Sequence, residues 1–272
     1  MASRFKYGVV GAGAVSASLI GQLPLKAREI GPVAAVSYRV ASRIANTLRA
    51  GFPVRSADAL NDPAAVLFHS PPDQAESLLA LLDDPVIDWA GKALIFCDCS
   101  APLAVRKRFQ ALGASVVVAR EFGIPGRIVL EADKGRDAAA LQTVQRIARQ
   151  LHLKTIEILP ASADVFDAAV TLGSGAFTAL IDSTAGLLRE AGMRDIEAAR
   201  IAASFFEQTA RDYVHSGKQS WTWYVRRPRV AQLNAQLKAA GPELEPVMKQ
   251  LLLFSFDTFH KHADAATELK VG

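Results

Sequence analysis

Residues 5–16 read FKYGVVGAGAVS, an apolar run that enters a Gly-x-Gly turn, and residues 17–22 continue with a helix-like composition. A strand, a tight glycine turn and a helix N-terminus together form the arrangement that binds the pyrophosphate of a dinucleotide. The first glycine permits the turn, and the second lets the backbone approach the phosphates, which face free N–H groups of the helix. The residues predicted to bind the phosphates are Gly11, Gly13, Ala14 and Val15.

The third position of this fingerprint, where the helix packs closely on the strand, holds Ser16 rather than glycine. Serine is small enough for that position, but it makes the motif a weaker match. The motif gains weight because an alternation of strands and helices follows it. The alternative is a glycine turn in an α/β protein of another kind.

The composition is that of a globular protein: of the 272 residues, 50% are hydrophobic and 21% charged. This length suits two domains. No uninterrupted apolar run approaches about 20 residues, so we expect no membrane-spanning helix. The chain leads directly into its first strand, from which we expect no signal peptide and a cytoplasmic location.

The charge argues against a nucleic-acid-binding protein, and the cysteine content argues against a metal-binding protein. The net charge of +4 is modest and the basic residues are scattered, so we expect no nucleic-acid partner. The only two cysteines, Cys97 and Cys99, have no further metal ligands near them in the sequence. They are typical of small buried thiols in a reducing compartment, and we expect no metal site.

Apolar strands alternate with helical segments through the first 160 residues, which predicts a parallel sheet covered on both faces. From residue 162 to 262 the pattern is helical throughout. We therefore predict an α/β fold, with an N-terminal Rossmann-type doubly wound parallel sheet followed by an all-helical C-terminal domain. The boundary near Pro160 separates a dinucleotide-binding domain, residues 1–160, from a helical substrate or dimerisation domain, residues 161–272. The predicted strands after the first are 32–38, 52–54, 65–70, 93–98, 115–119, 128–132 and 154–159.

The end of the second predicted strand indicates which dinucleotide is bound. An NAD site of this type carries an acidic residue there, but no Asp or Glu occurs between Glu29 and Asp58. The strand instead leads to Arg39, Ser42 and Arg43, donors that suit a 2′-phosphate. This predicts NADP as the cofactor. The alternative is a pair of solvated arginines at the start of a surface helix.

Ligands of such sheets lie outside the carboxyl ends of the strands. That rule adds four residues to the predicted cofactor site, from the ends of the fourth and fifth strands: His69, Ser70, Pro71 and Ser100. For His69 we prefer a strand-end histidine bonded to backbone over a catalytic role.

A polar stripe marks the apolar segment 164–182. Its polar residues recur at steps of four and three, which places them on one face of a helix. Gly173 and Gly175 within it each cost a helix about 1 kcal/mol, which suggests that a cofactor, a substrate or another helix approaches the backbone. A solvated polar face is the alternative, although the stripe lacks Lys, Glu and Arg. The stripe consists of Asp167, Thr171, Ser174, Thr178 and Asp182.

A second cluster, residues 215–229, mixes Trp221, Trp223 and Tyr224 with three arginines. It could bind a carboxylate or phosphate of a substrate, form a subunit contact, or consist of aromatic anchors beside solvated arginines. The sequence does not separate these interpretations.

The glycine motif at residues 11–16, the α/β layout and the segment DAAVTLGSGAF at residues 167–177 resemble the pyrroline-5-carboxylate reductase-like superfamily. Within it, the chain is most similar to Rossmann-like NADP-binding proteins with a short helical C-terminal domain. The resemblance implies an NADP-dependent reductase that forms a homodimer with intertwined helical halves and an active site between the domains. Related hydroxyacid dehydrogenases use a Lys and an Asn where this chain has Ala179 and Ser183.

These observations predict an NADP-dependent oxidoreductase that transfers a hydride to or from a carbonyl or imine carbon of a small molecule. Ser174 or Thr171 is the expected proton donor or polarising group, with Asp167 orienting it or relaying a proton. One alternative is an NADP-binding sensor or scaffold without catalysis, favoured because the stripe has no Lys, His or Tyr. Another is a prephenate-type dehydrogenase, in which His69 would face the nicotinamide.

Overall fold

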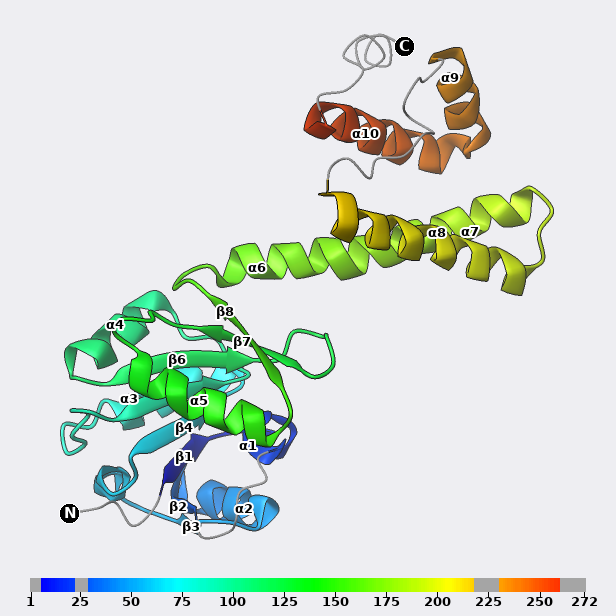
Figure 1. The fold of residues 1–272 in the computed structure, drawn as a ribbon. Helices are drawn as coiled ribbons and strands as arrows, with labels where there is room; N and C mark the ends of the chain where they lie inside the picture. The colour runs from blue at the N-terminus through cyan, green and yellow to red at the C-terminus, as the bar shows by residue number, and fades with distance from the viewer. Residues whose placement is uncertain (1–5, 23–28, 218–229, 260–272) are drawn as a thin grey trace. The chain divides into compact units, whose positions relative to one another are not determined.

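The computed structural model describes residues 6–22, 29–217 and 230–259 (Figure 1). Its contacts divide the chain into two compact units, Met1–Ala169 and Val170–Gly272. The boundary predicted from the sequence is near Pro160. Each unit is described by itself below.

The first unit contains an eight-stranded sheet with the order β3-β2-β1-β4-β5-β6-β7-β8. All neighbouring strands are parallel except β6 and β7, which are antiparallel. This sheet and the helical second unit confirm the predicted fold class. The strands are β1 (Tyr7–Gly11), β2 (Ile30–Ala34), β3 (Phe52–Pro53), β4 (Ala65–His69), β5 (Ala93–Cys97), β6 (Ser115–Arg120), β7 (Arg127–Glu131) and β8 (Lys154–Ile158).

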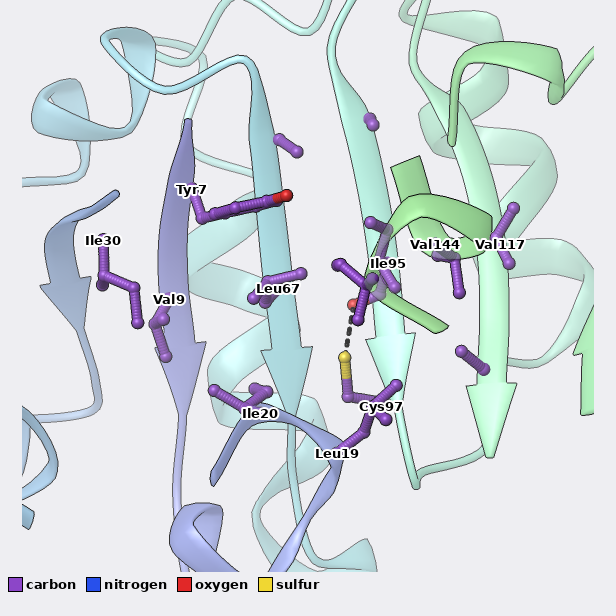
Figure 2. Packing of buried hydrophobic residues seen from close by; sticks show 14 of the residues in the cluster. Tyr7, Val9, Leu19, Ile20, Ile30, Leu67, Ile95, Cys97, Val117 and Val144 are labelled. Atoms are coloured by element: carbon purple, nitrogen blue, oxygen red, sulfur yellow. Dashed lines mark hydrogen bonds between the residues drawn. The ribbon is translucent and has the colours of Figure 1, made fainter. Parts of the chain in front are cut away.

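Side chains alternate between the two faces of this sheet, as the period of a strand requires. Val9, Leu67 and Ile95 belong to the buried cluster that packs beneath α5 (Ala138–Gln150), and Figure 2 shows them on neighbouring strands. Their neighbours along the chain, including Val10 and Phe68, belong to the cluster on the opposite face. Both faces of the sheet are therefore covered by buried apolar side chains, which explains why the strands are apolar without interruption. The remaining helices of this unit include α1 (Leu19–Gln22), α2 (Tyr38–Leu48), α3 (Ala75–Leu82), α4 (Leu103–Ala111) and α6 (Ala163–Val170).

The predicted second strand, 32–38, is wrong at its end. β2 finishes at Ala34, and Tyr38 is already the first residue of α2. The reason is the cap: the Ser37 hydroxyl accepts a hydrogen bond from Val40 N at 3.3 Å, which satisfies an otherwise free N–H of the helix. Arg39 consequently belongs to the first turn of α2 rather than to the strand.

The described part of the second unit is entirely helical. Its helices are a π-helical segment η4 (Thr171–Ala176), α7 (Phe177–Glu190), α8 (Asp195–Ser216), α9 (Val230–Ala239) and α10 (Gly241–Phe259). Leu237 is buried in a small cluster with partly buried Leu233 and Met248.

One helix of the described residues, Ala163–Glu190, is long and apolar enough to cross a membrane by length and composition alone. This helix contains no long uninterrupted apolar run, because small and polar residues separate its apolar ones. Core helices of water-soluble proteins pass the same test, but none of the apolar window of this helix is buried within the chain.

Candidate functional site

The glycine turn lies where the order of the strands reverses, between β1 and β4. In open α/β sheets this is the point at which ligands bind. Gly11 is paired with His69, and the N–H of Ala12 donates to the His69 carbonyl at 3.1 Å. A Cβ on Gly11 would lie 2.9 Å from the Val15 side chain, so the turn leaves no room for a larger residue.

Gly13 has a φ of +67°, which side chains other than glycine rarely adopt, and a Cβ there would lie 3.2 Å from the ring of Pro71. The predicted residues Gly13 and Pro71 therefore meet directly at the switch point. Within the described chain, the backbone N–H groups of Gly13 and Ala14 have no hydrogen-bond acceptor. Two free N–H groups in a glycine turn are suited to bind an anion.

The helix expected at residues 17–22 differs from the prediction. A 3-10 turn, η1 (Val15–Ala17), ends at Ser18, whose extended backbone interrupts the helix before α1 begins. The N–H of Leu19 donates to the Asp98 carboxylate, and that of Ile20 to the Ser18 hydroxyl. The expectation that the first N–H groups of this helix face a phosphate is therefore wrong for Leu19 and Ile20. The N–H groups of this segment that remain without an acceptor among the described residues are those of the glycine turn itself.

A cavity of 270 Å³ lies between the glycine turn and α2. Gly13, Val15 and Ser16 line one side of it, and Arg43 lines the other. Arg39 and Arg43 are exposed, and no acidic side chain of the described residues forms an ion pair with either. Ser42 is half-buried on the same helix. Two of the four predicted phosphate residues, Gly13 and Val15, thus line one cavity together with one of the two predicted arginines.

His69 is tied to the neighbouring strand. Its Nδ1 lies 2.8 Å from the carbonyl oxygen of Cys97, which can only accept, so Nδ1 donates this hydrogen bond. This is the backbone-bonded histidine that the sequence analysis preferred. Ser70 is buried and donates to the Pro71 carbonyl at 2.8 Å.

A second cavity of the first unit, of 590 Å³, lies at the carboxyl ends of β5 and β6 and is lined by charged side chains. Ser100 lines this cavity and not the one beside the glycine turn, so the predicted cofactor residues fall into two groups. Among the catalytic candidates, Asp167 lines it as well. The charged residues around it are Asp98, Arg106, Arg120, Glu121, Glu131, Asp164 and Asp167.

Two ion pairs belong to this cavity. Arg120 Nη1 donates to Asp167 Oδ2 at 2.8 Å, and the Asp167 side chain remains 49% exposed. Arg106 Nη2 donates to Glu131 Oε1 at 2.8 Å, and both residues are less than 5% exposed. Ala161 N donates to the same carboxylate oxygen at 2.5 Å. The first pair can contact a ligand, whereas the second is part of the protein interior.

Asp98 joins this cavity to the start of α1. Its carboxylate accepts hydrogen bonds from Leu19 N and from Glu121 N, so it links α1, β5 and the residue after β6. Its backbone is left-handed, with a φ of 50°. Such a conformation is tolerated in aspartate more readily than in most residues, and it turns the chain sharply after β5.

The two cysteines beside Asp98 are thiols of low reactivity. Burial raises the pKa of the Cys99 thiol to about 12, and it raises that of Cys97 well above its ordinary value. Both are free thiols. No group of three or more His, Cys, Asp or Glu within the described residues could hold a metal ion.

The residues of the predicted stripe that follow Asp167 lie in the second unit, and the four of them, Thr171, Ser174, Thr178 and Asp182, are exposed there. The Ser174 hydroxyl donates to the Val170 carbonyl at 2.6 Å, whereas the Thr171 hydroxyl has no partner among the residues described. A Cβ on Gly173 or Gly175 would meet nothing within 4 Å. The described chain therefore contains nothing that approaches these glycines, and they lie in a π-helical turn, a feature frequent at functional sites.

From residue 218 onward, the predicted aromatic and arginine cluster at 215–229 lies outside the described residues. Within them, sequence reasoning missed Asp98, Arg120 and the Arg106–Glu131 pair. An acidic residue at the end of an apolar strand, as in IVLE at residues 128–131, is a signal that could have indicated Glu131. Arg120 directly follows the predicted strand 115–119, at the edge of the sheet where ligands bind.

Comparisons with known proteins give one family model and a set of solved structures. The family model described as Domain of unknown function (DUF2520) matches residues 128–253. No protein in the comparison with curated proteins matches the chain.

Solved structures match almost the whole chain. A Pseudomonas putida KT2440 protein proposed to be an oxidoreductase is 16% identical, with a TM-score of 0.65 over 99% of this chain and 98% of its own. An imine reductase from Aspergillus terreus, in complex with NADPH4 and a dibenzazepine, is 16% identical, with a TM-score of 0.61 and 98% and 92% coverage. An imine reductase from Myxococcus stipitatus, in complex with NADP+, is 14% identical, with a TM-score of 0.56 and 97% and 91% coverage. These similarities show a shared fold.

Proposed function

We propose that this protein is an NADP-dependent oxidoreductase that acts on a carbonyl or imine carbon of a small molecule. The observation that carries this proposal is the glycine turn at the point where the strand order reverses. Among the described residues, the N–H groups of Gly13 and Ala14 have no acceptor, and Arg39 and Arg43 on the neighbouring helix form no ion pair with an acidic side chain. An acid that could bind a ribose 2′-hydroxyl is missing from the sequence between Glu29 and Asp58. The resemblance to the pyrroline-5-carboxylate reductase-like superfamily stays a prediction consistent with this proposal.

The residues present fit this cofactor. Gly11, Gly13 and the N–H groups of Ala14 and Val15 would hold the pyrophosphate, and Arg39, Ser42 and Arg43 would hold the 2′-phosphate. His69 to Pro71 and Ser100 would border the nicotinamide half. NADPH, when bound, supplies the hydride. Imine reductases that share the fold are known in complex with NADP+ and NADPH4, which supports the same cofactor here.

The protein's own groups would handle the proton and the orientation of the substrate. Arg120 holds the Asp167 carboxylate in place on the wall of the charged cavity, where it can orient a polar substrate group or accept and pass on a proton. Thr171 is the better of the two hydroxyl candidates, because the proton of Ser174 is engaged by Val170 O. We also place the protein in the cytoplasm, because both of its cysteines are free.

The direct test is a fluorescence titration with NADPH and NADH on the native chain and on Arg39→Ala. We expect tight NADPH binding and weaker NADH binding. In the variant, NADPH affinity should fall about 10- to 100-fold, since a charged hydrogen bond contributes about 1.5–3 kcal/mol, while NADH affinity stays unchanged. Equal binding of both cofactors by the native chain would overturn the 2′-phosphate assignment, and no binding of either would overturn the proposed function.

A non-catalytic NADP-binding sensor is the second candidate. The observation in its favour is that the hydroxyl proton of Ser174 is already bonded to backbone and that the described stripe has no strong acid or base besides its aspartates. Steady NADPH oxidation at 340 nm with any member of a panel of carbonyl and imine compounds would exclude a purely sensory role.

We further propose that the protein is a homodimer formed through its helical unit. A groove of 960 Å³ between α7 and α10 is lined by apolar side chains that are exposed in the single chain, among them Leu172, Phe177 and Val247. The apolar window of the long helix Ala163–Glu190, which includes α7, is also unburied within the described chain. Contiguous apolar surface of this kind is rare on monomers, and a second copy of the chain would cover it.

Sedimentation equilibrium should therefore give twice the 29.1 kDa of the chain. Leu172→Asp, at a position 71% exposed, should give a folded monomer, because a carboxylate would be buried in the dimer but solvated in the single chain. Val214→Asp is the matched control, since Val214 is 81% exposed but does not line the groove, and it should remain dimeric. A native chain that sediments as a monomer refutes the dimer.

A further inference from the structure

Arg55 is a basic residue that neither the sequence analysis nor the proposed cofactor site includes. It follows β3, the edge strand, which pairs in parallel with β2. Val54 N donates to the Val33 carbonyl at 3.0 Å, so the pairing continues up to the residue before Arg55. Because parallel strands end at the same edge of a sheet, Arg55 emerges beside the turn that leads from β2 into α2.

The Arg55 side chain is held at that turn by an aromatic ring. Its guanidinium carbon lies 4.4 Å from the centre of the Tyr38 ring, a cation–π contact. Tyr38 is the first residue of α2 and directly precedes Arg39. A guanidinium stacked on a ring keeps the N–H groups along its edge free to donate.

Three arginines thus gather at the start of α2: Arg39, Arg43 one turn further along the helix, and Arg55 on the stack. All three are exposed, and within the described chain none forms an ion pair with an acidic side chain. Like charges that gather without a counter-charge are mutually destabilising, so this arrangement is suited to an anionic ligand.

We propose that Arg55, positioned by Tyr38, is a specificity-determining residue that binds the 2′-phosphate of NADP together with Arg39. This inference rests on the proposed function and adds a residue from outside the β2–α2 segment to the cofactor site. Arg55 donates to the phosphate from the β3 side while Arg39 donates from α2. Tyr38 acts through Arg55 and is a positioning residue.

The test uses 2′,5′-ADP and ADP, two fragments that differ in the 2′-phosphate, and measures their affinities by isothermal titration calorimetry on the full chain. Arg55→Ala should weaken 2′,5′-ADP binding about tenfold and leave ADP binding unchanged, as expected for loss of a charge-assisted hydrogen bond. Tyr38→Leu should weaken 2′,5′-ADP binding about threefold, and Tyr38→Phe, which keeps the ring, should bind as the native chain does.

Arg127→Ala is the charge-matched control, because Arg127 is exposed on β7 of the same unit and the substitution removes the same unit charge. It should leave the ratio of the two affinities unchanged. A ratio that falls in Arg39→Ala but not in Arg55→Ala overturns the role of Arg55 and leaves the proposed function intact. A native chain that binds 2′,5′-ADP no better than ADP overturns both.

Discussion

Arg106→Met should lower the free energy of unfolding of the first unit by about 3–5 kcal/mol, the largest stability effect expected in the chain. The substitution removes the guanidinium that pairs with Glu131 at 2.8 Å and leaves that carboxylate, 3% exposed, with one backbone donor from Ala161. Urea unfolding followed by the fluorescence of Trp89, buried in the same unit, measures the loss once Trp221 and Trp223 are replaced by Phe.

Arg108→Met, on the same helix, is the matched control. Arg108 is paired with Asp83 at 2.9 Å, but its side chain is 47% exposed, so its removal should cost about 0–1 kcal/mol. Replacing both Arg106 and Glu131 by Met should recover most of the stability, because no buried charge then lacks a partner. If Arg106→Met and Arg108→Met lowered the free energy of unfolding by the same small amount, the Arg106–Glu131 pair would be solvated.

The fold could be predicted because its determinants are local. A continuously apolar strand such as 93–97 is buried on both faces of the sheet. Gly11 and Gly13 mark a turn in which there is no room for a larger residue at position 11 and in which position 13 has a positive φ. The predicted element boundaries are wrong where a single side chain decides whether the backbone is helical or extended. The hydroxyl of Ser37 starts α2 at Tyr38, and Ser18 interrupts the helix expected after the glycine turn.

The candidate site was predictable only where a known motif relates its residues to one another. Gly13, Val15 and Arg43 do line one cavity, as the motif and the basic segment together indicated. By contrast, Arg120 and Asp167 are 47 residues apart, and Asp98 reaches Leu19 across 79 residues. Neither contact follows from a spacing rule, since each depends on which strands lie side by side at the carboxyl edge of the sheet.

Asp167→Asn should reduce the rate of NADPH-dependent turnover about a hundredfold while leaving the affinity for NADPH unchanged. An amide is nearly the same size as the carboxylate, but it carries no charge to orient a substrate or accept a proton. The measurement is kcat from NADPH oxidation at 340 nm, with the carbonyl or imine compound that the native chain turns over fastest. Since the ion pair with Arg120 is half-exposed, the free energy of unfolding should change by only about 1 kcal/mol or less.

Asp164→Asn separates a chemical role of Asp167 from the general charge of the cavity. Asp164 is on the same helix, lines the same cavity and forms no ion pair with another described residue, so its replacement removes the same charge. If Asp167 acts on the substrate, Asp164→Asn should retain kcat within about threefold of the native value, because long-range charge effects at an open site are screened by salt. Equal losses in the two variants would mean that the cavity needs only its negative charge, and unchanged rates in both would remove Asp167 from the catalytic residues.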